Sequence, residues 1–174
     1  MNTKNLTLMA ILVAVGAALY LVIPGYGEGM KPDFMLTMMF IGIFLFPDVK
    51  SVFLLGATTG IISGIFTSFP GGFIPNIIDK FITAFIVYAV IVAMKKLSQH
   101  LVVSTMIACL GTLLSGTIFL SVAIYVMGAN VPFGLLFLTV VLPAIAMNGV
   151  VFFIMYPIIT GLLKRTSFKT ALHH

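Results

Sequence analysis

Long apolar runs alternate with short polar stretches along almost the whole chain. Six runs are long enough, or nearly long enough, to form membrane-crossing helices, and we expect them at 6–23, 32–46, 51–67, 75–94, 101–127 and 133–163. Because one crossing takes about 20 residues, six crossings with short loops occupy most of the 174 residues. The pattern predicts an all-α integral membrane protein with six transmembrane helices in a single membrane domain, 1–174.

Two of these runs depart from the usual length. The apolar part of the second run, Phe34 to Phe46, has 13 residues and would cover about 20 Å of a roughly 30 Å hydrocarbon layer. Either the helix begins at Pro32 or the preceding loop dips into the protein. The sixth run is longer than a crossing needs and contains Pro143 and Pro157, so we expect it to be kinked or to begin as an interfacial segment.

Small residues recur at every fourth position on two of the predicted helices. The first helix carries Ala10, Ala14 and Ala18, and the third carries Gly56, Gly60 and Gly64. A spacing of four residues places each set on one helical face, where a neighbouring backbone can approach closely. We therefore expect the glycine face to pack against other helices.

The composition supports the membrane class. Hydrophobic residues make up 61% of the chain, charged residues 7%, and the mean hydropathy is +1.24. A soluble domain carries about 25% charged residues, so a water-soluble fold is excluded. Six crossings leave no room for a soluble catalytic domain. We expect the lipid bilayer to surround the chain, and we expect no nucleic-acid partner.

Charged residues are distributed unevenly between the two ends of the predicted helices. With both termini in the cytoplasm, the inner segments hold seven of the nine basic residues, namely Lys4, Lys50, Lys95, Lys96, Lys164, Arg165 and Lys169. Enrichment of Lys and Arg on the cytoplasmic side is the general rule for membrane proteins, and it favours this orientation. The outer side holds Lys31 and Lys80 with three of the four acids, Glu28, Asp33 and Asp79. A binding site for a zwitterion would combine both signs of charge in this way.

Four polar residues form a stripe on the fourth predicted helix. Asn76, Asp79, Lys80 and Thr83 follow one another at i, i+3, i+4 and i+7, which places them on one face. A charge that faces lipid near the membrane centre costs about 2.5 to 3.5 kcal/mol on insertion scales, so the stripe is expected to face inward. The alternative is that Asp79 offsets the positive helix N-terminus and Lys80 snorkels outward.

Further candidate residues lie in the first outer loop, the second outer loop and the sixth helix. Lys31 and Asp33 flank Pro32, and capping of the following helix by Asp33 is the alternative to a binding role. Asn148 lies near the middle of the sixth helix, where it either joins helices by hydrogen bonding or contacts a ligand. The aromatic candidates are Phe34, Phe69 and Phe73, for which packing in the core or the membrane interface is the alternative.

Several kinds of chemistry have no support in the sequence. There is no G-x-x-x-x-G-K-[S/T] phosphate loop, no H-E-x-x-H and no G-x-S-x-G. Cys109 is the single cysteine, and His100 is distant from His173 and His174, a terminal pair compatible with the remnant of a purification tag. We expect no metal, no cofactor and no enzyme activity. Transport against a gradient would then need an ATP-hydrolysing partner or an ion gradient.

Three stretches resemble a known family. They are Gly29-Met-Lys-Pro-Asp33, the run from Met38 to Pro47, and Phe69-Pro-Gly-Gly-Phe-Ile-Pro-Asn-Ile-Ile-Asp-Lys80. They look like the tryptophan-specific substrate-binding (S) component of energy-coupling factor (ECF) transporters, the TrpP family. The likeness covers almost the whole chain, and the second outer loop is its most specific part.

The resemblance implies a multi-pass protein of the bacterial plasma membrane with the S-component fold. Such a component captures its substrate from outside, beneath the loops joining spans one and two and spans three and four. It docks on a transmembrane coupling subunit driven by two ATPase subunits, and it is thought to topple in the membrane to release substrate inside. Docking commonly uses an Ala-x-x-x-Ala face on the first span, which Ala10 and Ala14 match. The start Met-Asn-Thr-Lys-Asn lacks the Met-His set of metal-type S components, which argues against nickel or cobalt.

Together these observations predict a tryptophan site in the outer half of the membrane. The carboxylate of tryptophan is expected near Lys31 or Lys80, its ammonium near Asp79 or Asp33, and its indole among Phe and Met side chains. The alternative is a stand-alone secondary transporter of an aromatic amino acid or another small zwitterion. An intramembrane enzyme is a weaker alternative, because no nucleophile with a base is visible. An assembly protein is also a weaker alternative, because the charged residues gather on one side of the membrane.

Overall fold

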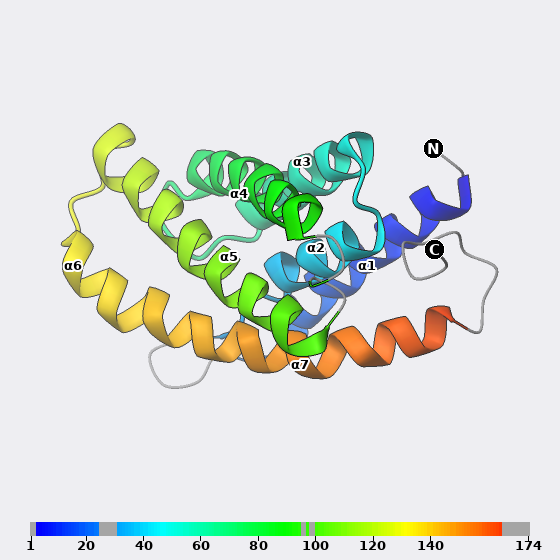
Figure 1. Ribbon diagram of the computed structural model, residues 1–174. Helices are drawn as coiled ribbons and strands as arrows, with labels where there is room; N and C mark the ends of the chain where they lie inside the picture. Colours follow the sequence, from blue (N-terminus) through cyan, green and yellow to red (C-terminus); the bar gives the residue numbers. More distant parts are fainter. Residues whose placement is uncertain (1–2, 25–30, 95–96, 98–99, 165–174) are drawn as a thin grey trace.

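The computed structural model describes residues 3–24, 31–94, 97 and 100–164. Its elements are α1 (Thr3–Val22), α2 (Phe34–Leu45), α3 (Val49–Ile65), α4 (Phe73–Met94), α5 (Leu101–Ser121), the π-helical η2 (Val122–Val126), α6 (Phe133–Leu136), the π-helical η3 (Phe137–Val141) and α7 (Leu142–Leu163). Since η2 continues α5, and α6, η3 and α7 form one rod, the described ranges make six helical rods without a strand (Figure 1). The predicted all-α membrane class is confirmed.

Helix α2 is the centre of the bundle. It contacts α1, α3, α4, α5 and α7, and every residue from Phe34 to Phe46 is buried. Non-helical backbone at membrane depth is tolerated where protein covers it. The chain enters this helix through the half-buried residues Lys31, Pro32 and Asp33, which are not helical. The expected start at 32 is therefore wrong, and the loop that dips into the protein is the alternative that the structure adopts.

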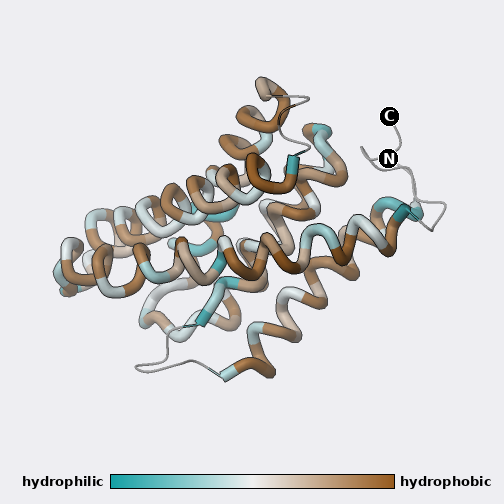
Figure 2. The backbone as a smooth tube through the Cα atoms, turned by 60° about the horizontal axis from the view of Figure 1, so that its bottom comes forward, coloured by the Kyte–Doolittle hydropathy of each residue, from teal (hydrophilic) through white to brown (hydrophobic). Residues whose placement is uncertain are grey.

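The rods differ in their ability to cross a membrane. Four are long and apolar enough, namely Thr3–Val22, Phe73–Met94, Leu101–Val126 and Phe133–Leu163. Helix α3 has 17 residues and lies at the lower limit for a crossing, whereas α2 has 12 and spans about 18 Å. Figure 2 shows hydrophobic residues along most of each long helix. The short α2 needs no match to the lipid thickness because other helices surround it.

The long last rod contains both prolines noted in the sequence. The π-helical segment η3 directly precedes Pro143, which lies in the first turn of α7, and Pro157 lies inside α7. A proline ring clashes with the carbonyl group four residues earlier, here that of Thr139 within η3. The wider π-helical turn accommodates this clash without ending the rod.

Helices α3 and α4 pack through the predicted glycine face. A Cβ atom at Gly60 would lie 3.0 Å from the Cα atom of Ile77, and one at Gly56 would lie 3.0 Å from the Cβ atom of Ala84. Gly64 lies equally close to the backbone of Phe73. The predicted packing of this face is confirmed, and it brings the start of α4 firmly against the end of α3.

We expect Gly60→Ala to lower the stability of the purified protein by about 1 to 3 kcal/mol, because the added methyl group meets backbone atoms of α4 that cannot rotate away. Gly161→Ala is the matched control, since a Cβ atom at this position of α7 meets nothing within 4 Å. In this control the change should be neutral or stabilising, by up to about 1 kcal/mol. Thermal unfolding in detergent measures both variants. Equal effects would mean that the close approach of α3 and α4 does not limit stability.

Candidate functional site

A cavity of about 250 Å³ opens at the end of the bundle where α1 ends and α2 and α4 begin. Residues of α5, α6, η3 and α7 complete its wall, as do Thr67 and Phe69 of the loop between α3 and α4. Small-molecule sites usually measure about 300 to 1,000 Å³. The cavity is therefore suited to a ligand no larger than an amino acid.

The polar stripe of α4 faces this end of the bundle interior. Asn76, Asp79, Lys80 and Thr83 are all buried, and the exposed positions of the same helix carry apolar side chains such as Ile82. This confirms that the stripe faces inward. The arrangement keeps both charges of α4 away from lipid, where they would be most costly.

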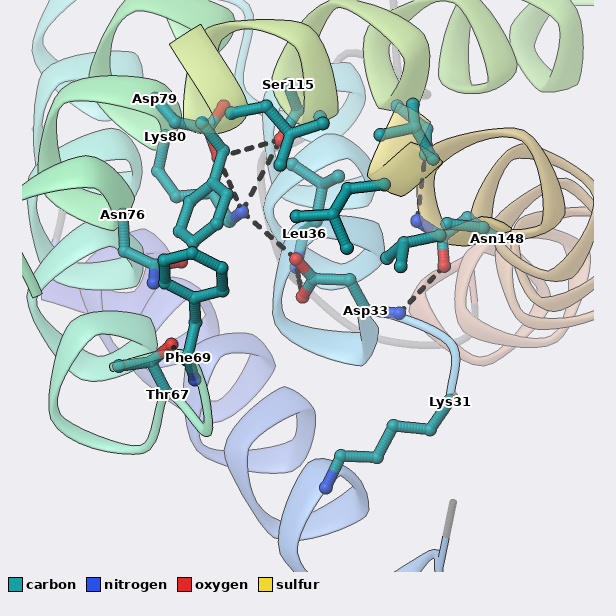
Figure 3. Close-up of a pocket in the computed structure, with 18 of the residues that line it drawn as sticks. Lys31, Asp33, Leu36, Thr67, Phe69, Asn76, Asp79, Lys80, Ser115 and Asn148 are labelled. Carbon is teal, nitrogen blue, oxygen red and sulfur yellow. Dashed lines mark hydrogen bonds and ion pairs between the residues drawn. The ribbon is translucent and has the colours of Figure 1, made fainter. Parts of the chain in front are cut away.

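The Lys80 amine lies at the centre of a charged cluster. Its Nζ atom is 2.8 Å from Oδ2 of Asp79 and 3.0 Å from Oδ2 of Asp33, and it donates a longer hydrogen bond of 3.4 Å to Oγ of Ser115 (Figure 3). The side chain is 4% exposed. The alternative in which Lys80 snorkels outward is therefore wrong.

Asp79 is enclosed completely. Its side chain is 0% exposed, and it accepts hydrogen bonds from Oγ1 of Thr83 at 3.0 Å and from Oγ of Ser115 at 2.8 Å. Thr83 thus supports the carboxylate from behind and does not line the cavity. Because neighbouring donors occupy both oxygens, Asp79 acts on the cavity mainly through Lys80.

Asp33 combines a capping role with an ion pair. Its Oδ1 atom accepts a hydrogen bond of 2.9 Å from the backbone N–H of Leu36, which makes it the N-cap of α2. Its Oδ2 atom pairs with Lys80, and its side chain is 31% exposed. The two interpretations of Asp33, capping and charge pairing, hold together.

Asn148 fastens three elements together at the cavity wall. Its Oδ1 atom accepts a hydrogen bond of 2.8 Å from the backbone N–H of Asp33, and its Nδ2 atom donates one of 3.2 Å to Oγ1 of Thr112. These bonds join α7 to α5 and to the start of α2. The predicted helix-joining role is therefore observed, and Asn148 also lines the cavity.

Lys31 has a different environment from Lys80. Its amine donates a hydrogen bond of 2.8 Å to the backbone carbonyl oxygen of Tyr20 and lies 3.5 Å from the centre of the Tyr20 ring, a cation–π contact. Figure 3 shows the side chain pointing away from the Asp33 and Lys80 cluster. Asp33 thus pairs across the bundle with Lys80 and not with its neighbour in sequence, Lys31.

The apolar wall differs from the one expected. Phe69 lines the cavity and packs edge-on against Phe119, with ring centres 5.3 Å apart. Phe34 and Phe73 do not line it. The backbone of Phe34 lies beside Gly16 of α1, and Phe73 packs on Gly64 at the crossing of α3 and α4. Among the described residues no methionine contributes to the lining. The expected Phe and Met surroundings are therefore corrected to Phe, Leu and Val side chains.

Comparison with known proteins decides the family. The sequence profile of the family described as "Tryptophan transporter TrpP" matches residues 2–164. This chain belongs to the TrpP family. Two relatives named "Probable tryptophan transport protein" are 46% identical in Bacillus subtilis (98% of this chain, 99% of the relative) and 38% identical in Clostridium perfringens (95% and 96%). No solved structure matches the chain. The recognition from the sequence is confirmed, and the TrpP chain is a transport protein with several apolar helices suited to a multi-pass membrane protein.

Several residues that line the cavity of this TrpP chain were not predicted from the sequence. Tyr20, Thr112, Ser115 and Phe119 line the cavity, but in the sequence the two hydroxyl residues belong to a face of small residues on the fifth helix. Their spacing of three residues places both hydroxyl groups on one face, which is the signal that could have identified them. Tyr20 and Phe119 carry no such signal, because aromatic residues are frequent throughout the chain.

Some predictions for the TrpP chain fall outside the described residues. These are the outer acid Glu28, the basic residues Lys95, Lys96, Arg165 and Lys169, the terminal His173 and His174, and the Gly29-Met30 part of the first family-like stretch. Within the described part of the chain, no three His, Cys, Asp or Glu side chains gather in a way that would hold a metal ion.

Proposed function

We propose that this chain is the membrane-embedded S component of an ECF-type importer in the bacterial plasma membrane, and that it captures tryptophan from outside. The observation that carries the proposal is the cavity itself. It joins a buried acid and lysine cluster to an aromatic and aliphatic wall at one end of an otherwise apolar bundle. Membership of the TrpP family supports tryptophan as the substrate.

The cavity combines polar and apolar groups, as a tryptophan molecule does. Asp33, Lys80 and Asn148 supply the polar groups of the cavity, and Phe69 and Phe119 supply aromatic rings. The charged backbone groups of an amino acid would add partners to the buried charges, which reduces their desolvation cost. The indole ring would bury apolar surface against the aromatic pair, in the edge or offset geometry that aromatic rings prefer.

The orientation follows from the positions of the basic residues. Lys4 begins α1, Lys50 lies in the first turn of α3 and Lys164 follows α7, so all three lie at the end of the bundle opposite the cavity. Figure 1 shows the start of α1 and the end of α7 on the same side of the molecule. The positive-inside rule favours this end as cytoplasmic, which leaves the cavity open to the outside.

A shallow apolar groove between α1 and α3 is the proposed docking surface for the coupling subunit. Ala10 and Ala14 are exposed on it, and its other lining residues are Leu6, Met9, Val13, Leu54, Leu55, Thr58 and Ile62. Alanines spaced by four allow a partner helix to approach closely, which is how helices associate within a membrane. Two ATPase subunits would then supply the energy for transport, because the chain itself has no sequence motif for ATP hydrolysis.

Thermal-shift measurements on the purified protein against the twenty amino acids test the substrate. Tryptophan should raise the apparent melting temperature, since a ligand at a hundredfold excess over its dissociation constant stabilises by about 2.7 kcal/mol. Tyrosine and phenylalanine should give little or no shift. A response to none of the twenty, or an equal response to many, would contradict tryptophan-specific capture. Calorimetry with tryptophan then provides the affinity.

A further inference from the structure

The lysine in the cavity is already neutralised by the protein. An ammonium group has three hydrogens to donate, and within the described residues Lys80 has three acceptors for them, Asp79, Asp33 and Ser115. A substrate carboxylate could reach Lys80 only by displacing one of these partners. Lys80 is therefore poorly placed to be the group that recognises the carboxylate.

The cluster instead has a surplus of carboxyl groups. Asp79 accepts hydrogen bonds from Lys80, Ser115 and Thr83, and Asp33 accepts from Lys80 and from the backbone N–H of Leu36. Two carboxyl groups therefore share the single amine of Lys80. An ammonium group of a substrate would supply a second cation for the carboxyl group that it can reach.

Asp33 is the more accessible of the two carboxyl groups. Both residues line the cavity, but the side chain of Asp79 is 0% exposed whereas that of Asp33 is 31% exposed. The position of Asp33 is defined from three sides, by Lys80, by the N-terminus of α2 and by the bond from its own N–H to Asn148. It is a rigid anionic group at the cavity surface.

We propose that Asp33 binds the ammonium group of the substrate and that Asp79 and Lys80 are positioning residues that hold Asp33 in place. The site would then select indole compounds that carry a primary ammonium group, and the substrate carboxylate would contribute less to binding. Among the lysines expected to meet that carboxylate, Lys31 is the better placed, because within the described residues its amine donates one hydrogen bond, to the Tyr20 carbonyl, and belongs to no ion pair. This inference rests on the proposed tryptophan function and extends it to the orientation of the substrate.

Two analogues of tryptophan separate its charged ends. Tryptamine lacks the carboxylate, and indole-3-propionate lacks the ammonium group. Hydrogen bonds to charged groups contribute about 1.5 to 3 kcal/mol, or roughly 10- to 100-fold in affinity. By calorimetry on the full-length protein we expect tryptamine to bind within about tenfold of tryptophan, and indole-3-propionate to bind about 10- to 100-fold more weakly than tryptophan. Tight binding of indole-3-propionate with loss of tryptamine would overturn the proposal.

A substitution at the proposed residue tests the same point independently. Asp33→Asn keeps a good N-cap and leaves the Asp79 and Lys80 pair intact, so the fold should be retained. We expect tryptophan and tryptamine to lose about 10- to 100-fold in affinity, with indole-3-propionate unchanged or improved. Asp48→Asn is the matched control, because Asp48 caps α3 through Ser51 in the same way but is exposed and does not line the cavity.

The outcomes distinguish the two levels of the proposal. If tryptophan itself does not bind the wild-type protein, the proposed function fails. If tryptophan binds and the Asp33→Asn protein binds it with unchanged affinity, the function stands and the role of Asp33 is refuted. The analogue measurement needs only the wild-type protein, so it decides the orientation even if the variant does not fold.

Discussion

Lys80→Met is expected to abolish tryptophan binding and to lower the apparent melting temperature of the purified protein more than any other single change discussed here. The substitution removes the amine that pairs with both Asp33 and Asp79. The two carboxyl groups then lie near each other with no lysine between them. Removal of one partner from a buried ion pair costs about 3 to 5 kcal/mol. A 100-fold loss of affinity corresponds to about 2.7 kcal/mol of binding free energy. We expect the affinity for tryptophan to fall by more than this factor. Calorimetry and thermal unfolding in detergent measure the two effects.

Two controls make the result specific. In the double variant Lys80→Met with Asp79→Asn, one positive and one negative charge are removed together, so stability should recover in part relative to Lys80→Met alone. Lys50→Met removes an exposed lysine at the opposite end of the bundle and should change neither property. If Lys80→Ala and Asp79→Ala both bound tryptophan with unchanged affinity, the assignment of this cluster to the substrate site would be wrong.

Ala10→Trp and Ala14→Trp are expected to leave tryptophan binding intact and to reduce uptake to background. Both alanines are exposed in the groove between α1 and α3, and neither lies near the cavity. A bulky ring at either position would prevent the close helix approach that alanine allows. Uptake is measured in proteoliposomes that contain the coupling subunit, the ATPase subunits and ATP, and binding is measured on the isolated variants.

Ile11→Trp is the control for this second experiment, because Ile11 is exposed on the same helix but does not line the groove. It should retain both binding and uptake. Loss of binding and folding in the alanine variants would make their face an internal packing surface. Uptake driven by a proton gradient with this chain alone would favour the secondary transporter over the S component.

The sequence alone predicted the class of fold and the direction in which the polar face of α4 points. Six apolar runs are visible because lipid requires long apolar helices with internally paired backbones. Asp79 and Lys80 were expected to face inward because charge is costly in lipid, and the structure then excluded the alternative in which Lys80 snorkels outward. The glycine face of α3 was predictable for a similar reason, since spacing by four residues defines a face whatever the partner is. These features depend on local periodicity and on the solvent.

The partners of these residues were decided by the tertiary structure. Periodicity shows which side chains share a face, but the register and crossing of helices determine which faces meet. Asp33 meets Lys80 and Asn148 across the bundle, and nothing in the order of the residues indicated these partners. Phe73 packs on Gly64 of α3 and does not line the cavity, and Phe34, although it directly follows Asp33, does not line it either.

The central position of α2 is the clearest case of this division. From the sequence, a 13-residue apolar run was compatible with a slightly longer helix or with a loop that enters the protein. Only the surrounding helices make the short form stable, because they cover the non-helical entry at residues 31–33 and supply Lys80 and Asn148 to Asp33. The apolar pattern determined that these residues lie within the membrane domain, and the packing around α2 determined that Asp33 presents a charged oxygen to the cavity.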